Sequence, residues 1–115
     1  MVSFVDHYRY TDGVRRPLLT RIHQHVHGLS GNLVEKISKK QRLAYKKPGR
    51  LIFLEVKVER HAIGLHMIDV PDPRGLLSPI PASHKWGRLF RRFKVRTQAD
   101  LGYALSAIRN AYLRG

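Results

Sequence analysis

The sequence LIFLEVKV at residues 51–58 is the strongest structural signal in this chain. It begins as a continuous apolar run and ends with apolar residues alternating with Glu55 and Lys57, a pattern typical of a largely buried β-strand. A second apolar run, at residues 61–70, follows after only two residues and places Ile63, Leu65 and Met67 on one face. Two such strands joined by so short a connection predict an antiparallel hairpin.

Shorter signals on both sides of this hairpin complete an α–β–α order. Apolar residues recur at helical spacing from Val14 to Val26 and again from Leu101 to Tyr112, the second run after a capping-box-like start at residues 97–100. Three further strands are predicted at residues 33–38, 42–46 and 89–96. Consecutive strands between two helices predict an α+β domain, with a mostly antiparallel sheet of about five strands flanked by an N-terminal and a C-terminal helix.

The 115 residues are expected to form a single domain, residues 1–115. Residues 1–13 are interpreted as an N-terminal arm, and residues 71–87 as a proline-rich surface loop because they hold Pro71, Pro73, Pro79 and Pro81. No apolar run approaches the roughly 18 residues of a membrane span, the first ten residues lack the layout of a signal peptide, and cysteine is absent. These features predict a cytoplasmic protein without disulfides.

Charge is the most unusual property of the sequence. The chain has 22 Lys and Arg against 8 Asp and Glu, a formal charge of +14, and 13 of the cations fall in two acid-free segments, residues 36–50 and 85–96. In an extended β-strand Arg92, Lys94 and Arg96 project on one side about 7 Å apart. This spacing is close to that of the phosphates along one strand of a nucleic acid. The sequence therefore predicts nucleic-acid binding, through phosphates and shape, with DNA and RNA both open. The predicted phosphate contacts are Lys39, Lys40, Arg42, Lys46, Lys47, Arg88, Arg92, Lys94 and Arg96, and the predicted stacking rings are Tyr45 and Trp86.

Two other function classes fit parts of the pattern. A charged face could dock an acidic partner protein. A metal-dependent nuclease would use Glu55-Val56-Lys57, which matches the Glu-x-Lys half of a nuclease pattern in which an Asp comes first. Asp69, Asp72 and His84 flank the proline-rich loop, and His23 and His27 stand one helical turn apart, but neither set supplies a complete ligand or catalytic pattern. No glycine-rich phosphate loop or nucleophile motif is present. We therefore expect no enzymatic activity, no cofactor and no bound metal.

Several segments resemble a bacterial domain family of unknown function. The resemblance rests on Asp6-His7-Tyr8, residues 39–45 (KKQRLAY), Trp86-Gly87 and residues 100–105 (DLGYAL). The family occurs as short proteins and as a C-terminal module, including on predicted restriction-type nucleases, and some members are labelled predicted transport protein. The resemblance implies an α+β sheet domain similar to the small double-wing proteins and supplies no catalytic residues. Where the family usually has a small polar residue, Gly and Asp after its Trp-Gly, this chain has Arg88-Leu89-Phe90, which replaces an acidic turn with a basic one and favours nucleic-acid affinity.

Overall fold

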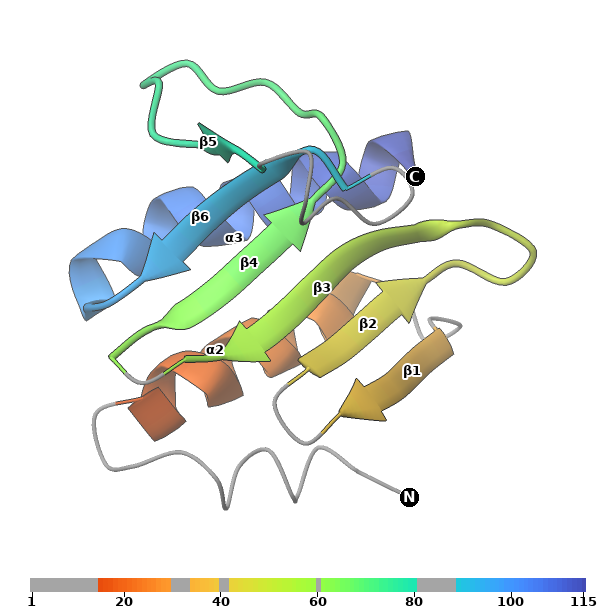
Figure 1. The fold of residues 1–115 in the computed structure, drawn as a ribbon, viewed down its shortest axis with the longest axis horizontal. Helices are drawn as coiled ribbons and strands as arrows, with labels where there is room; N and C mark the ends of the chain where they lie inside the picture. The colour runs from red at the N-terminus through yellow and green to blue at the C-terminus, as the bar shows by residue number, and fades with distance from the viewer. Residues whose placement is uncertain (1–14, 30–33, 40–41, 60, 81–88) are drawn as a thin grey trace.

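A computed structural model describes residues 15–29, 34–39, 42–59, 61–80 and 89–115, with the backbone alone at positions 34–39 and 42. The elements in chain order are α2 (Arg15–Leu29), β1 (Val34–Lys39), β2 (Arg42–Lys46), β3 (Ile52–Val58), β4 (Ile63–Met67), β5 (Ser78–Pro79), β6 (Arg91–Val95) and α3 (Gln98–Arg114). The sheet has the order β1-β2-β3-β4-β6-β5, and every pairing is antiparallel (Figure 1). The α+β prediction is confirmed, with β5 as a two-residue addition to the five expected strands.

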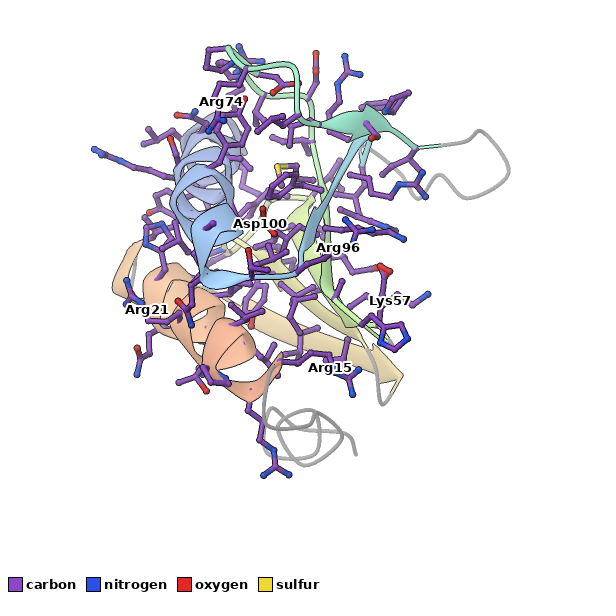
Figure 2. All side chains as sticks on the ribbon, turned by 90° about the vertical axis from the view of Figure 1, so that its left-hand side faces the viewer. Arg15, Arg21, Lys57, Arg74, Arg96 and Asp100 are labelled. Atoms are coloured by element: carbon purple, nitrogen blue, oxygen red, sulfur yellow. The ribbon has the colours of Figure 1, made fainter. Side chains whose placement is uncertain are left out.

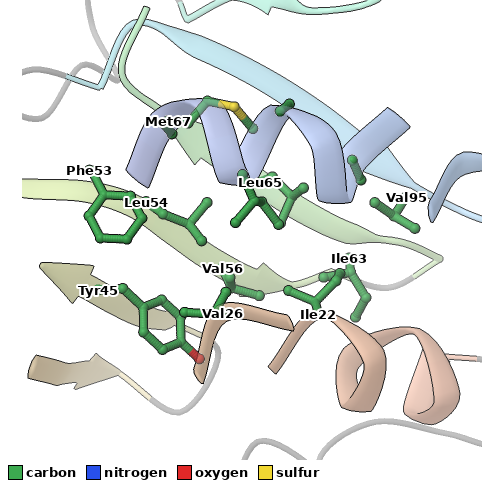
Figure 3. Packing of buried hydrophobic residues seen from close by; sticks show 14 of the residues in the cluster. Ile22, Val26, Tyr45, Phe53, Leu54, Val56, Ile63, Leu65, Met67 and Val95 are labelled. Carbon is green, nitrogen blue, oxygen red and sulfur yellow. The ribbon is translucent and has the colours of Figure 1, made fainter. Parts of the chain in front are cut away.

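Both helices lie on one side of the sheet, behind it in Figure 1 and to its left in Figure 2. The hydrophobic core fills the space between these two layers (Figure 3). It includes Ile22 and Val26 from α2 and Leu54, Val56 and Leu65 from the central strands, each no more than 1% exposed. The opposite face of the sheet carries no helix among the described residues and is called the open face below.

Local sequence explains where the elements begin and turn. Helix α3 starts after Thr97 because the Asp100 carboxylate accepts hydrogen bonds from the backbone N–H groups of Arg96 (2.8 Å) and Thr97 (3.1 Å). The β2–β3 connection turns at Gly49, whose φ of 73° lies in the left-handed region that glycine adopts without steric cost.

The described part of the predicted loop, residues 71–80, is anchored to the rest of the fold. Asp72 accepts hydrogen bonds from the backbone N–H groups of Leu76 (2.9 Å) and Leu77 (3.0 Å) and from the hydroxyl of Tyr103 in α3. Leu77 and Ile80 are buried, and β5 pairs this segment with β6. The remainder of the loop, and the predicted arm at residues 1–13, lie outside the described residues. Neither helix of the described chain is long and apolar enough to cross a membrane.

Candidate nucleic-acid interface

The pairing register assembles the basic residues into rows that run across the open face. Directly opposed residues of antiparallel strands share a face of the sheet. Leu54 opposes Met67 and Val56 opposes Leu65 on the buried face, so the alternate positions belong to the open face. One row contains Arg42, Lys57, Gly64 and Lys94, and the next contains Ala44, Glu55, His66, Arg92 and Ser78.

These rows connect the two acid-free segments of the sequence. Arg42 comes from the first segment, and Arg92 and Lys94 come from the second. Lys57, which belongs to neither segment, occupies the register position between Arg42 and Lys94. Adjacent strands lie about 4.8 Å apart, so the backbones at Lys57 and Lys94, separated by β4, are roughly 10 Å apart.

Two carboxylates also lie on this face, and each lies close to a basic side chain. Glu59 Oε2 lies 3.5 Å from Lys94 Nζ. A side chain at position 64 would collide with the Glu59 carboxylate, so Gly64 provides the space in which that carboxylate rests. Glu55, with a side chain only 10% exposed, lies 3.9 Å from Nδ1 of His66.

The remaining cations of the open face lie outside these two pairings within the described ranges. Among the described residues, no carboxylate forms an ion pair with Lys57, Arg92 or Arg96. Figure 2 shows Lys57 and Arg96 on the side of the sheet away from the helices, whereas Arg21 lies on the helical side. Among the described side chains, the open face therefore carries a net positive charge, with Lys57, Arg92, Lys94 and Arg96 against Glu55 and Glu59.

The predicted contacts in the first basic segment are distributed over different parts of the molecule. Arg42 belongs to the basic row by register, and Lys39 is its partner on β1. Lys46 lies at the opposite end of β2, where it pairs with Ile52. Lys47 lies beside the helical layer, with its Nζ 4.4 Å from the centroid of the Tyr112 ring in α3. The structure therefore groups Arg42, but not Lys47, with Arg92 and Lys94. Lys40, Trp86 and Arg88 lie outside the described residues.

The prediction that Tyr45 stacks on bases is wrong for this fold. Tyr45 is 1% exposed, so no base can reach the faces of its ring. It opposes Leu54 on the buried side of the sheet, and its hydroxyl oxygen lies 3.4 Å from Nδ1 of His23 in α2. The ring of His27 meets it edge-on at 5.8 Å. Strand alternation explains the error: Leu43 and Tyr45 share the core face even though cations surround them in sequence.

Sequence reasoning missed Lys57 as a member of the basic row. It was considered only as part of a catalytic pattern with Glu55. The signal that could have found it is the alternation of β3, which places Lys57 on the polar side, combined with the short connection to β4.

The other titratable clusters serve the fold. The rings of His23 and His27 lie 4.3 Å apart, and burial together with the charge of His27 lowers the pKa of His23 to about 4. Asp69 forms an ion pair with Arg91 at 3.0 Å, and the hydrogen bond from the Tyr103 hydroxyl lowers the pKa of Asp72. Within the described ranges, no three His, Cys, Asp or Glu residues gather to hold a metal ion. His84 lies outside these ranges.

Fold and surface together define an α+β domain with two helices on one sheet face and a basic open face on the other. Comparison with protein-family models, with curated proteins and with solved structures finds no match to this chain.

Proposed function

We propose that this domain binds nucleic acid with the open face of its sheet, mainly through phosphate contacts. The observation that carries the proposal is the cross-strand row that joins Arg42, Lys57 and Lys94, since it brings cations from separated segments to one surface. Arg92, in the adjacent row, and Arg96, just beyond the end of β6, extend this surface.

The chemistry of this face suits a polyanion better than it suits base-specific recognition. Lys57, Arg92 and Arg96 have no carboxylate partner in the described chain, so a phosphate can approach them without displacing an ion pair. The centre of the face offers few groups that could read bases, because Ala44 is small and the Glu59 carboxylate occupies the space beside Gly64. Contacts to phosphates fix the position of a protein on nucleic acid without reading its sequence.

Matched variants test whether the site or the total charge is responsible. Lys57→Gln with Arg92→Gln removes two positive charges from the open face. Arg21→Gln with Arg109→Gln removes two from exposed positions on α2 and α3, which lie in the other layer. Binding of a labelled duplex is measured by fluorescence anisotropy between about 50 and 200 mM salt, a range over which phosphate contacts lose affinity steeply.

The expected result is a change in the salt dependence that is specific to the open face. Each phosphate contact contributes about −0.9 to the log–log slope on duplex DNA, so the Lys57 and Arg92 double variant should flatten the slope by roughly 1.8. The control pair should leave the slope close to that of the wild type. A flat salt response in the wild type, or equal losses in both double variants, would contradict the proposal.

A further inference from the structure

A hollow of about 290 Å³ lies beside β6, next to the point where β5 ends. β5 pairs only with Arg91 and Arg92, so β6 continues past it into this hollow. The residues that line the hollow are Leu76, Ser78, Arg92, Phe93, Lys94 and Arg96. Because Arg92 and Lys94 also belong to the basic rows, the hollow is continuous with the open face.

Two kinds of chemistry meet in this hollow. Arg92, Lys94 and Arg96 provide three cations, and of these only Lys94 has a carboxylate partner among the described residues. Leu76 and Phe93 provide apolar surface, and Leu76 is 41% exposed.

The apolar surface is held in place by the fold. The backbone N–H of Leu76 donates to Asp72 Oδ1 at 2.9 Å, and the same carboxylate accepts the hydroxyl of Tyr103 from α3. The ring of Phe93 lies against that of Tyr103, with centroids 5.9 Å apart. Tyr103 of α3 therefore supports both apolar residues of the hollow, so the small apolar part of its mainly polar lining is held in place by the fold.

We propose that this hollow receives one base of a single-stranded nucleic acid, with the base against Leu76 and Phe93 and the adjoining phosphates on Arg92, Lys94 and Arg96. The inference rests on the proposed function and deepens it by naming the strand state of the ligand. Pockets for small ligands span roughly 300–1,000 Å³. The volume of the hollow lies at the lower limit of this range, so it suits a single small group such as one base. A duplex keeps its bases stacked inside the helix and has to extrude one to use the site, whereas a single strand presents its bases freely.

Two exposed leucines allow a matched test. Leu76→Ala removes the aliphatic part of the hollow's apolar surface and leaves Phe93 in place, and Leu113→Ala removes an exposed leucine, 63% accessible, from α3. Binding is measured with a short labelled oligothymidylate and with a duplex of the same length. We expect Leu76→Ala to weaken oligothymidylate binding about fivefold, the effect of losing part of a leucine contact. Duplex binding should be unchanged, and Leu113→Ala should alter neither affinity. Circular dichroism melts confirm that both variants remain folded.

The outcomes separate this inference from the function on which it rests. If the wild type binds both nucleic acids and Leu76→Ala changes neither affinity, the hollow plays no part and the inference is overturned, while the proposed function stands. If the wild type binds neither, both fail. If oligoglutamate of equal charge displaces oligothymidylate as effectively as unlabelled strand does, the hollow recognises an acidic polypeptide, and the inference is overturned.

Discussion

Replacing Tyr45 tests the central correction that the structure makes to the sequence-based prediction. The ring is 1% exposed and packs between β2 and α2 (Figure 3). Tyr45→Ala therefore removes a core aromatic and leaves a cavity, a change that costs roughly 3–5 kcal/mol. Domain stabilities are about 5–15 kcal/mol, so this loss is a large fraction of the total. At about 4 °C per kcal/mol for a domain of this size, the melting temperature should fall by roughly 12–20 °C.

Tyr45→Phe is the matched control because it keeps the ring and removes only the hydroxyl. The hydroxyl oxygen lies 3.4 Å from Nδ1 of His23, a long hydrogen bond. Its loss should cost no more than about 1 kcal/mol. The edge-on contact with the His27 ring is kept, so Tyr45→Phe should fold and bind nucleic acid as the wild type does.

The assay combines thermal melts, followed by far-ultraviolet circular dichroism, with anisotropy titrations at a temperature at which all variants are folded. We expect a large loss of stability for Tyr45→Ala and no loss of affinity in the folded fraction of either variant. A Tyr45→Ala protein that melts with the wild type but binds nucleic acid several-fold more weakly would place the ring on the surface. That result would restore the stacking role and refute the register given for β2.

Two further predictions concern stability. Asp100→Ala removes the acceptor for the N–H groups of Arg96 and Thr97 and should lower the free energy of unfolding by about 1 kcal/mol in urea titrations. Ser106→Ala, at an exposed site in the same helix, should change it little. Burial and His27 lower the pKa of His23 from 6.5 to about 4. As the pH falls below 6.5 the unfolded chain therefore takes up a proton that the folded chain resists, and stability should decline until about pH 4. His23→Gln should reduce this decline in melts recorded across that range, and an unchanged pH dependence would contradict the assignment.

Local patterns predicted the elements well. The alternation at residues 89–96 placed Arg92 and Lys94 on one side and Phe93 and Val95 on the other, and the pairing with β4 bears this out. The acidic residue in the first turn of α3 marked the start of that helix because its carboxylate bonds to the backbone N–H groups that precede the helix. Such signals depend only on neighbours in sequence, and a single sequence contains them.

The site could not be derived in the same way because it depends on register and on tertiary contacts. A shift of one residue in the pairing register would move every side chain of a strand to the other face of the sheet. The pairing of β2 with β3 contains such an irregularity, between Tyr45 and Lys46 of β2, and no turn motif in the sequence predicts it. The union of Arg42, Lys57 and Lys94 follows from that register. Leu76 lay in a segment predicted only as a loop, and its place beside the basic face depends on the bonds of Asp72 to Leu76 and Tyr103.

The placement of the acids explains why several cations of the open face have no carboxylate partner among the described residues. Asp72 and Asp100 are engaged mainly with backbone N–H groups, which neutralises no cation. Asp69 and Glu59 each form an ion pair with one cation of β6, Arg91 and Lys94. These bonds use the carboxylates to fix a loop, a helix start and a strand end, and Lys57, Arg92 and Arg96 are left with no carboxylate partner in the described chain. Repulsion among unpaired cations opposes the compact state, and a polyanion that binds only the folded chain relieves it and stabilises the fold. The same arrangement of acids that supports the architecture thus leaves unpaired cations on the surface that we propose as the phosphate-binding site.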